Sequence, residues 1–374
     1  MSGLGKLLPS LRPESPDLLH LDFLRLLASY GIVLVHFRTN LLSPFAGREA
    51  IARNLDSFAL CVDLFFVISG FVISWVYRDR IDGLGSYGRF LRKRVARLVP
   101  LHWATLLFFV LAWAAGTAVG ASFDRAEKYD FDCLVPNLLM IHAWGVCGGP
   151  SFNSVSWSIS AEMAMYAAFP LLFWAATRSV TGFALFFAAL VAALYLFSGD
   201  QFWAERTYNL GVLRAFPGFC FGILLYRHRD RLARIAGARW WLAAAMVLFG
   251  AAAIAGTGKP WLLPLAYLIP LLGVAADMQG RVGPLVRSLA PGGRLTYSIY
   301  MLHPVVQSVF IVLIGRKLLA LDGMGLTVWT LLAFPLVAVV GYLSLFLFEE
   351  PARRLMSGTS RRPSVDARGE RISI

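Results

Sequence analysis

Apolar blocks long enough to cross a membrane occupy most of this chain. A transmembrane helix needs about 20 mostly apolar residues to span about 30 Å of hydrocarbon. The sequence is 58% hydrophobic and only 15% charged, whereas soluble domains average about 45–50% apolar and about 25% charged residues. Buried core helices of a large soluble protein are the alternative interpretation, but no polar block is long enough to form a separate soluble domain. The sequence therefore predicts an all-α, polytopic integral membrane protein.

About ten transmembrane helices are expected from the lengths of these blocks. Their predicted ranges are 18–40, 57–77, 98–119, 157–176, 180–198, 208–226, 240–256, 260–277, 295–315 and 326–348. The chain would then consist of an N-terminal segment (1–17), a transmembrane domain (18–355) and a tail (356–374). The tail is rich in Ser, Arg, Gly, Asp and Pro, so we expect it to be disordered.

Lysine and arginine are distributed unequally between the two sides of the predicted bundle. With the N-terminus placed inside, 25 of the 35 lie on the cytoplasmic side, 9 lie on the outer side, and Arg214 lies within a span. Cytoplasmic loops retain Lys and Arg, so both termini are predicted to be cytoplasmic, in a bacterial inner membrane. The net charge of +13 then faces anionic lipid of the inner leaflet, and no nucleic-acid partner is expected.

The largest predicted outer loop, 120–156, contains Cys133 and Cys147. On the oxidising side of a bacterial inner membrane two such thiols can form a disulfide. Two unpaired thiols are the alternative, and the sequence leaves the choice open. Cys61 and Cys220 fall within predicted spans, where a free cysteine behaves as a small apolar residue.

Two ionisable residues of the first span, Arg25 and His36, lie on one face of a helix. They are eleven residues apart, which is three turns and about 16.5 Å of rise. A charge at mid-bilayer costs at least about 2.5–3.5 kcal/mol on insertion scales, so its presence requires a reason. We expect Arg25 to bind an anion at the cytoplasmic mouth and His36 to act as a general base deeper in the membrane. A core hydrogen bond to a neighbouring helix is the alternative role for His36.

Three further ionisable residues, Asp63, Glu162 and Arg214, fall a few residues inside the outer ends of their spans. Buried charges are normally paired, so these residues could join helices as ion pairs. They could also line an outward-facing pocket together with His36. The sequence does not decide between these alternatives.

The predicted inner loop after the second span is rich in arginine and ends at Pro100. Arg94 and Arg97 form an i, i+3 pair on a helical stretch, and Arg92 lies in the same region. Guanidinium groups suit phosphate oxygens, so these three arginines are predicted to bind a phosphate-bearing ligand, with Arg25 nearby. Anchoring of a basic loop to anionic lipid is the alternative.

The sequence lacks the motifs of several other enzyme classes. The chain has no P-loop, no Gly-x-Ser-x-Gly and no dinucleotide fingerprint, which argues against a primary pump. No cluster of Cys or His has the spacing of metal ligands. We therefore expect no metal ion and no tightly bound cofactor.

Several segments, in order along residues 18–355, together resemble the membrane acyltransferase-3 family. They are Leu21-Asp22-Phe23-Leu24-Arg25 with Val35-His36, Val62-Asp63-Leu64-Phe65-Phe66-Val67-Ile68-Ser69-Gly70-Phe71, the arginine-rich loop ending at Pro100, Ser156-Trp157-Ser158-Ile159-Ser160-Ala161-Glu162 with Tyr166 and Pro170, Arg214-Ala215-Phe216-Pro217-Gly218-Phe219, Tyr297-Ser298-Ile299-Tyr300-Met301-Leu302-His303-Pro304, and Glu350-Pro351. The first of these is similar to the family's Arg-x10-His signature. The resemblance covers nearly the whole chain.

The resemblance implies an O-acyltransferase that carries an acyl group, commonly acetyl, from cytoplasmic acyl-CoA to a hydroxyl of a carbohydrate or glycolipid at the outer face. It implies that His36 is the catalytic histidine, Arg25 its partner, and the inner-loop arginines donor-side residues. An acidic functional position near the end of the last span would be Glu350 or its neighbour Glu349, with Glu350 favoured because it precedes Pro351.

The residues and the resemblance together predict a mechanism. Coenzyme A would bind at Arg92, Arg94 and Arg97, and neutral His36 would deprotonate the acceptor hydroxyl as it attacks the thioester. An acyl-histidine intermediate is the alternative route. Glu162 or Asp63 would orient the imidazole or bind the acceptor, and the sequence leaves that choice open.

The remaining membrane charges, Asp63 and Arg214, are expected to bind the acceptor together with Glu350. The competing function is a secondary transporter or flippase of a glycan or lipid-linked intermediate. The acceptor, the acyl group and the oligomeric state stay open.

Overall fold

The computed structural model describes residues 9–45, 47–120, 128–197, 199 and 201–358, together with the backbone of two short strands near the C-terminus. Residues 121–127 of the predicted outer loop, the first eight residues and most of the predicted tail lie outside the described residues. The two strands, β1 (Ser364–Val365) and β2 (Arg371–Ile372), pair antiparallel, with Ser364 opposite Ile372.

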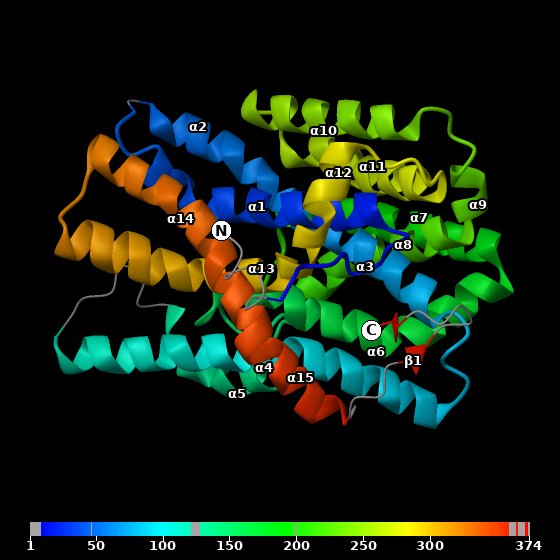
Figure 1. The fold of residues 1–374 in the computed structure, drawn as a ribbon, viewed down its shortest axis with the longest axis horizontal. Coiled ribbons are helices and arrows are strands. Elements are labelled where there is room, and N and C mark those ends of the chain that lie inside the picture. The colour runs from blue at the N-terminus through cyan, green and yellow to red at the C-terminus, as the bar shows by residue number, and fades with distance from the viewer. Residues whose placement is uncertain are drawn as a thin grey trace.

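Helices form almost all of the described chain, as the apolar blocks predict (Figure 1). The α-helices are α1 (Leu19–Leu41), α2 (Arg48–Leu55), α3 (Cys61–Tyr77), α4 (Leu84–Ala118), α5 (Leu134–Leu138), α6 (Trp157–Arg178), α7 (Val180–Leu196), α8 (Gly211–Arg227), α9 (Arg229–Leu232), α10 (Ala238–Ile254), α11 (Lys259–Met278), α12 (Pro284–Leu289), α13 (Thr296–Val306), α14 (Gly323–Ser344) and α15 (Glu350–Ser357).

Shorter helical turns and two π-helices connect or extend these elements. The 3₁₀ turns are η2 (Asp56–Leu60), η4 (Phe131–Cys133), η5 (Ser154–Ser156), η6 (Trp203–Glu205) and η7 (Ala290–Leu295), and the π-helices are η8 (Gln307–Leu318) and η9 (Leu345–Glu349).

Seven helices of the described chain are long and apolar enough to cross a membrane. They cover Leu19–Leu41, Arg48–Tyr77, Leu84–Ala118, Ser154–Arg178, Lys259–Met278, Pro284–Leu318 and Gly323–Ser357. Helices α7 and α10 are apolar but shorter, and α8 carries Arg214 and Arg227. The multi-span, all-helical class is therefore confirmed, while a total of ten crossings and cytoplasmic termini stay predictions.

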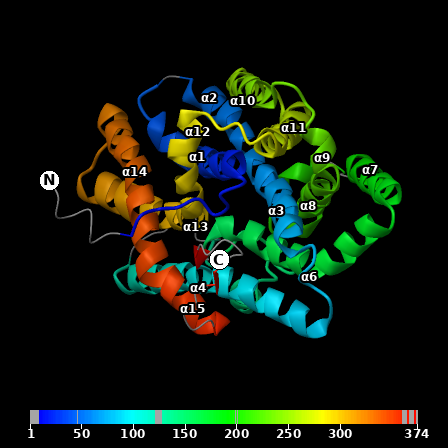
Figure 2. The same cartoon turned by 45° about the vertical axis from the view of Figure 1, so that its right-hand side comes forward.

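Helix α1 lies in the interior of the bundle, between α10 and α11 on one side and α4 and α6 on the other (Figures 1 and 2). It packs against α3, α11, α13 and α14. Its first turn is held by α11, where the Asp277 carboxylate accepts from the backbone N–H groups of His20 (2.8 Å) and Leu21 (3.1 Å). Gly293 of η7 lies so close to the backbone of Asp22 that a Cβ there would overlap it. These contacts fix the depth of α1 in the bundle.

Helices α3 and α8 approach each other backbone to backbone. A Cβ on Gly70 would collide with the carbonyl of Phe219, and one on Gly222 with the carbonyl of Val67. Small residues of this kind permit the close packing that holds membrane helices together. The close approach also brings the polar residues of the two helices within reach of one another.

Helix α4 begins at Leu84, 14 residues before the predicted start of that span at residue 98. The arginine-rich segment is therefore the first half of one continuous 35-residue helix, so the predicted helical stretch is longer than expected, and its location on the inner side stays a prediction. The basic residues ended the apolar pattern without ending the helix, because Arg and Lys are good helix formers. The predicted i, i+3 spacing of Arg94 and Arg97 holds on this helix.

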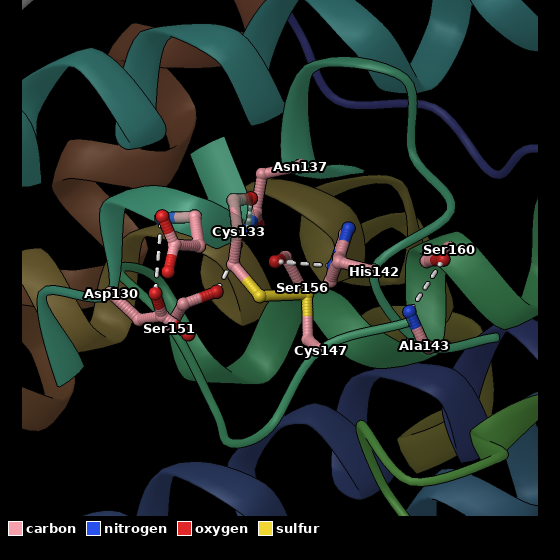
Figure 3. The surroundings of a disulfide bond; sticks show 10 residues. Asp130, Cys133, Asn137, His142, Ala143, Cys147, Ser151, Ser156 and Ser160 are labelled. Carbon is pink, nitrogen blue, oxygen red and sulfur yellow. Dashed lines mark hydrogen bonds between the residues drawn. A yellow bond between two sulfur atoms is a disulfide. The ribbon is translucent and has the colours of Figure 1, made fainter. Parts of the chain in front are cut away.

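The segment that follows α4 folds back against the bundle and contains a disulfide between Cys133 and Cys147, with Cα atoms 5.7 Å apart (Figure 3). The sequence left open whether these two cysteines are paired or unpaired, and the structure has them paired. Buried Asn137 donates to the Cys133 carbonyl and to Ser151 Oγ, both at 2.8 Å. His142 is buried, and its Nε2 lies 3.1 Å from Ser156 Oγ.

Removing the disulfide is expected to destabilise this segment. The Cys133→Ser/Cys147→Ser double variant should lose about 3 kcal/mol of unfolding free energy, because the cross-link closes a loop of about 15 residues in the unfolded chain. Thermal unfolding of the purified protein in detergent, with and without reductant, measures the effect. A melting temperature of the wild type that does not respond to reductant would show that the bond is absent.

A second prediction concerns His142, which lies outside the membrane-spanning segments. Burial, with the stacked ring of His102 as a smaller cause, lowers the pKa of His142 to about 3. Below pH 6.5 the unfolded chain therefore binds a proton that the folded chain excludes, and stability falls by up to about 1.4 kcal/mol per pH unit.

Melting temperatures at pH 7.5 and pH 5.5 test this. The drop on acidification should be smaller in His142→Gln, which keeps an acceptor for Ser156 but cannot titrate in this range. Equal drops in the variant and the wild type would contradict the assignment.

Candidate functional site

Helix α1 carries Arg25 and His36 on one continuous helix, as the sequence predicts. Arg25 lies near its beginning and His36 near its end, so about 16.5 Å of helical rise separates them. The Arg25 guanidinium binds the carboxylate of Glu14 and lies 3.5 Å from that of Asp22. His36 is half-buried.

Glu14 joins two of the predicted anion-binding arginines. Its two carboxylate oxygens bind Arg25 of α1 and Arg97 of α4. Asp22 positions it by accepting from the backbone N–H groups of Glu14 (2.8 Å) and Ser15 (3.4 Å). Burial alone would raise the pKa of Glu14, but the Arg97 and Arg25 guanidinium groups outweigh it and hold that pKa well below its usual range. Glu14 is therefore an anion in this site.

A charged pocket opens beside this cluster. It is lined by Glu14, Arg97, Arg294, Tyr297, Leu345, Glu349, Glu350 and Arg353. Glu350 binds Arg294 and lies 3.4 Å from Arg354. The pocket thus combines three guanidinium groups with three carboxylates.

The two acidic residues at the end of the last span have different partners. Glu349 accepts from the hydroxyls of Ser298 and Ser344, both at 2.7 Å, whereas Glu350 is paired with arginine. The π-helix η9 leads directly into this pair. Such widened turns occur often at functional sites, because they change the direction of the following side chains.

The other two predicted donor-side arginines point elsewhere. Arg94 lies over the rings of Tyr77 and Tyr166, with its carbon 5.4 and 5.8 Å from their centroids, and donates to the Tyr77 hydroxyl. Arg92 donates to the carbonyl of Ser357 in α15 at 2.6 Å. The structure therefore brings Arg97 and Arg25 together but not all four arginines, and donor binding by Arg92 and Arg94 stays a prediction.

A second histidine lies against His36. The ring of His303, on α13, has its centroid 4.8 Å from that of His36, and the two rings are inclined by 53°. His303 is fully buried. Gln307, at the start of the π-helix η8, donates to the His36 carbonyl at 2.8 Å and helps to fix α1 against α13.

Glu162 lies between α3 and α6, and its carboxylate accepts from the hydroxyls of Ser69 (2.6 Å) and Tyr166. The guanidinium group of Arg94 lies over the ring of the same Tyr166. The structure records no ion pair of Glu162 within the residues it describes. It does not decide whether this carboxylate orients His36 or faces a pocket, so its predicted catalytic role stays a prediction.

Asp63 and Arg214 form a buried two-point ion pair across the α3–α8 contact. Arg214 Nη2 lies 2.7 Å from Asp63 Oδ2, and its Nε lies 3.3 Å from Oδ1. Arg214 also donates to the Ala59 carbonyl and lies over the ring of Trp157 at 5.1 Å. This geometry favours the ion-pair alternative for both residues, and acceptor binding by them stays a prediction.

Sequence reasoning missed two residues of the candidate site, Glu14 and His303. Glu14 lies in a short polar segment without helical periodicity, so nothing in the sequence predicts that it folds onto Arg25 and Arg97. His303 stood in a recognised motif, but pairing between α1 and α13 had to be known before its partner could be named. Matching depth does not identify the pair either, because the predicted spans place His36 18 residues and His303 eight residues from their inner ends.

The arrangement separates two kinds of chemistry. One end of α1 adjoins a pocket whose arginines suit an anion, and the other end carries the imidazole of His36. Helix α13 connects the same two regions, because Tyr297 lines the pocket and His303, six residues on, is about 9 Å further along the axis. No group of three metal-ligating side chains occurs among the described residues.

Two known proteins share sequence with this chain. It is 37% identical over 120 residues to the acyltransferase MdmB of Streptomyces mycarofaciens, a match covering 30% of this chain and 28% of MdmB. It is 27% identical over 335 residues to the exopolysaccharide production protein ExoZ of Rhizobium meliloti (strain 1021), covering 85% of this chain and 98% of ExoZ. No solved structure matches the chain.

The family comparison covers far more of the chain than the MdmB match does. The model of the acyltransferase domain family (Acyl_transf_3) matches residues 18–347, which include α1 with Arg25 and His36, α4 with Arg97, and α13 with His303. The chain therefore belongs to the acyltransferase-3 family and is an acyl-transferring membrane enzyme.

Proposed function

We propose that this enzyme transfers an acyl group, with acetyl favoured, from cytoplasmic acyl-CoA to a hydroxyl of a carbohydrate or glycolipid at the outer face of a bacterial inner membrane. The observation that carries the proposal is the path along α1 and α13. Each helix has one functional residue beside the arginine pocket and another at the pair of histidines. A ligand that is anionic at one end and reactive at the other would bridge these two regions.

The donor's phosphates would bind where Glu14 now bridges Arg25 and Arg97. Arg353 also lines the pocket and forms no ion pair within the described part of the chain. Guanidinium groups bind phosphate oxygens in a two-point geometry. The phosphates of coenzyme A would thus replace the Glu14 carboxylate at two guanidinium groups that already lie close together. The pantetheine arm would then lead the thioester towards His36.

At His36 the chemistry is a general-base step. The neutral imidazole removes the proton of the acceptor hydroxyl as its oxygen attacks the thioester carbon. The C–O bond of the ester forms, the C–S bond breaks, and the leaving thiolate takes up the proton from the imidazolium. An acyl-histidine intermediate is the second route open to the same residue.

The side of the membrane follows from the charge distribution, because Lys and Arg gather on the cytoplasmic side. The arginine pocket then faces the cytoplasm, where acyl-CoA is made. The carbohydrate acceptor is suggested by the printed name of ExoZ, an exopolysaccharide production protein. Asp63 and Arg214, with Glu350, would act on the acceptor only if their present ion pairs opened.

The direct test is release of CoA thiol from acetyl-CoA by the protein in lipid nanodiscs, with a pooled bacterial glycan extract as acceptor. Loss of a general base typically costs about 10²- to 10⁴-fold in rate, so His36→Ala should fall by that factor while still binding acetyl-CoA. His228→Ala, a histidine at the end of α8 away from the site, is the matched control and should retain activity.

Equal turnover by His36→Ala and the wild type would remove His36 from the reaction. Movement of a glycan across the membrane without CoA release would favour the transporter or flippase instead. No binding of acetyl-CoA by folded protein would contradict the donor assignment.

A second prediction concerns Glu14. Because its carboxylate competes with donor phosphates for Arg25 and Arg97, Glu14→Gln should tighten acetyl-CoA binding by about tenfold, equivalent to about 1.4 kcal/mol. Arg97→Gln should weaken it. Glu49→Gln, which removes an exposed charge of α2, is the control.

Equilibrium binding of acetyl-CoA to the protein in nanodiscs, at two salt concentrations, measures these effects. Weaker binding by Glu14→Gln would show that Glu14 supports the donor site rather than competing for it. An Arg97→Gln variant with unchanged affinity would place the phosphates elsewhere.

A further inference from the structure

His303 has a buried nitrogen that the fold does not use. Its Nδ1 lies 3.3 Å from the carbonyl of Ile299, one turn earlier on α13. Because a carbonyl only accepts, this contact assigns the ring proton to Nδ1 and leaves a lone pair on Nε2. That Nε2 is buried and has no hydrogen-bond partner among the residues that the structure describes. An unsatisfied buried polar atom destabilises the fold, so its presence requires an explanation.

Among the rings around His303, one can donate a hydrogen bond to its Nε2. Its ring faces those of Phe37 and Tyr300, with centroids 6.3 and 6.0 Å away, and that of His36 at 4.8 Å. The Tyr300 hydroxyl is already used, because it donates to the Val155 carbonyl (3.0 Å) and accepts from Ser158 Oγ (2.9 Å). Of the rings that face His303, the imidazole of His36 is the one able both to donate to Nε2 and to change its protonation.

The two histidines differ in access. His303 is fully buried, whereas His36 is half-buried. Part of His36 is therefore exposed at the surface of the protein, whereas His303 is not. This difference gives them different roles, with His36 at the reacting atoms and His303 behind it.

We propose that His303 is a positioning residue, whose Nε2 accepts a hydrogen bond from one ring N–H of His36 and so directs the other His36 nitrogen towards the acceptor hydroxyl as the base. The bond would close in the reacting complex by a rotation of the His36 ring, since catalytic hydrogen bonds often tighten only when substrate is bound. This inference rests on the proposed role of His36.

The proton balance is simple. His36 takes the proton of the acceptor hydroxyl and becomes an imidazolium with two N–H groups. One donates to His303 Nε2, and the other returns the proton to the leaving thiolate of CoA. His303 gains and loses no proton, because its lone pair only accepts the hydrogen bond. Outer partners of this kind fix the ring orientation and tautomer of the histidine they contact.

Three substitutions at His303 separate positioning from packing. His303→Leu fills the space without an acceptor. His303→Gln can place its amide oxygen near the position of Nε2, whereas the shorter His303→Asn reaches only the region of Nδ1. Thr330→Val is the matched control, because Thr330 of α14 is also fully buried with a hydroxyl that has no partner.

The measurement is the kcat and the KM for acetyl-CoA, with its binding measured separately, for these variants beside the wild type and His36→Ala in nanodiscs. Loss of an interaction made only in the transition state lowers kcat with little change in KM. We expect Leu and Asn to lower kcat by about 100-fold, and Gln by no more than about fivefold. All should bind acetyl-CoA as the wild type does, and Thr330→Val should be fully active.

The outcomes distinguish this inference from the proposed function. If His36→Ala is inactive but His303→Leu keeps its kcat within about twofold, only the positioning role fails. Equal losses in Gln and Asn, or loss of acetyl-CoA binding in every His303 variant, would show a packing role and overturn the inference. Activity that survives in His36→Ala but not in His303→Gln would exchange the two roles and overturn both proposals.

Discussion

The position of helix α1 is the constraint on which the rest of the structure depends. Asp277 of α11 caps its first turn, Gly293 lets η7 approach its backbone, and Gln307 binds the carbonyl of His36 near its other end. A shift along its axis would break these contacts and separate both Glu14 from Arg97 of α4 and His36 from His303 of α13. Arg25 and His36 lie on this one helix, so the anion site and the proposed base are separated by a fixed helical rise of about 16.5 Å.

Burying an unpaired charge away from water destabilises a protein. The buried charged groups of this enzyme are satisfied in different ways. Asp63 and Arg214 neutralise each other completely, so their interaction serves to join α3 to α8. Glu162 accepts from two hydroxyls instead of a cation. At Glu14 one carboxylate is shared by two guanidinium groups, those of Arg25 and Arg97. A phosphate-bearing donor would bind by replacing that shared carboxylate.

Periodicity and charge predicted the architecture well, because the apolar blocks and the spacing of Arg25 and His36 are local properties of the chain. They failed where a decision depended on distant contacts. The arginines before Pro100 ended the hydrophobic pattern but not helix α4. Arg94 and Arg97 share a helix face, yet one meets tyrosine rings and the other Glu14. The Cys133–Cys147 bond and the pairing of His303 with His36 became visible only when loops and helices were placed in space.

A structure determined with a non-hydrolysable acetyl-CoA analogue in lipid nanodiscs would test the central claim most directly. The account predicts phosphate density against Arg97 and Arg25, with Glu14 displaced from both, and the acyl end of the analogue beside His36. If instead Glu14 still bridged the two arginines while the analogue bound elsewhere, the path from the arginine pocket to the histidines would not be the route of the donor, and the account would be wrong.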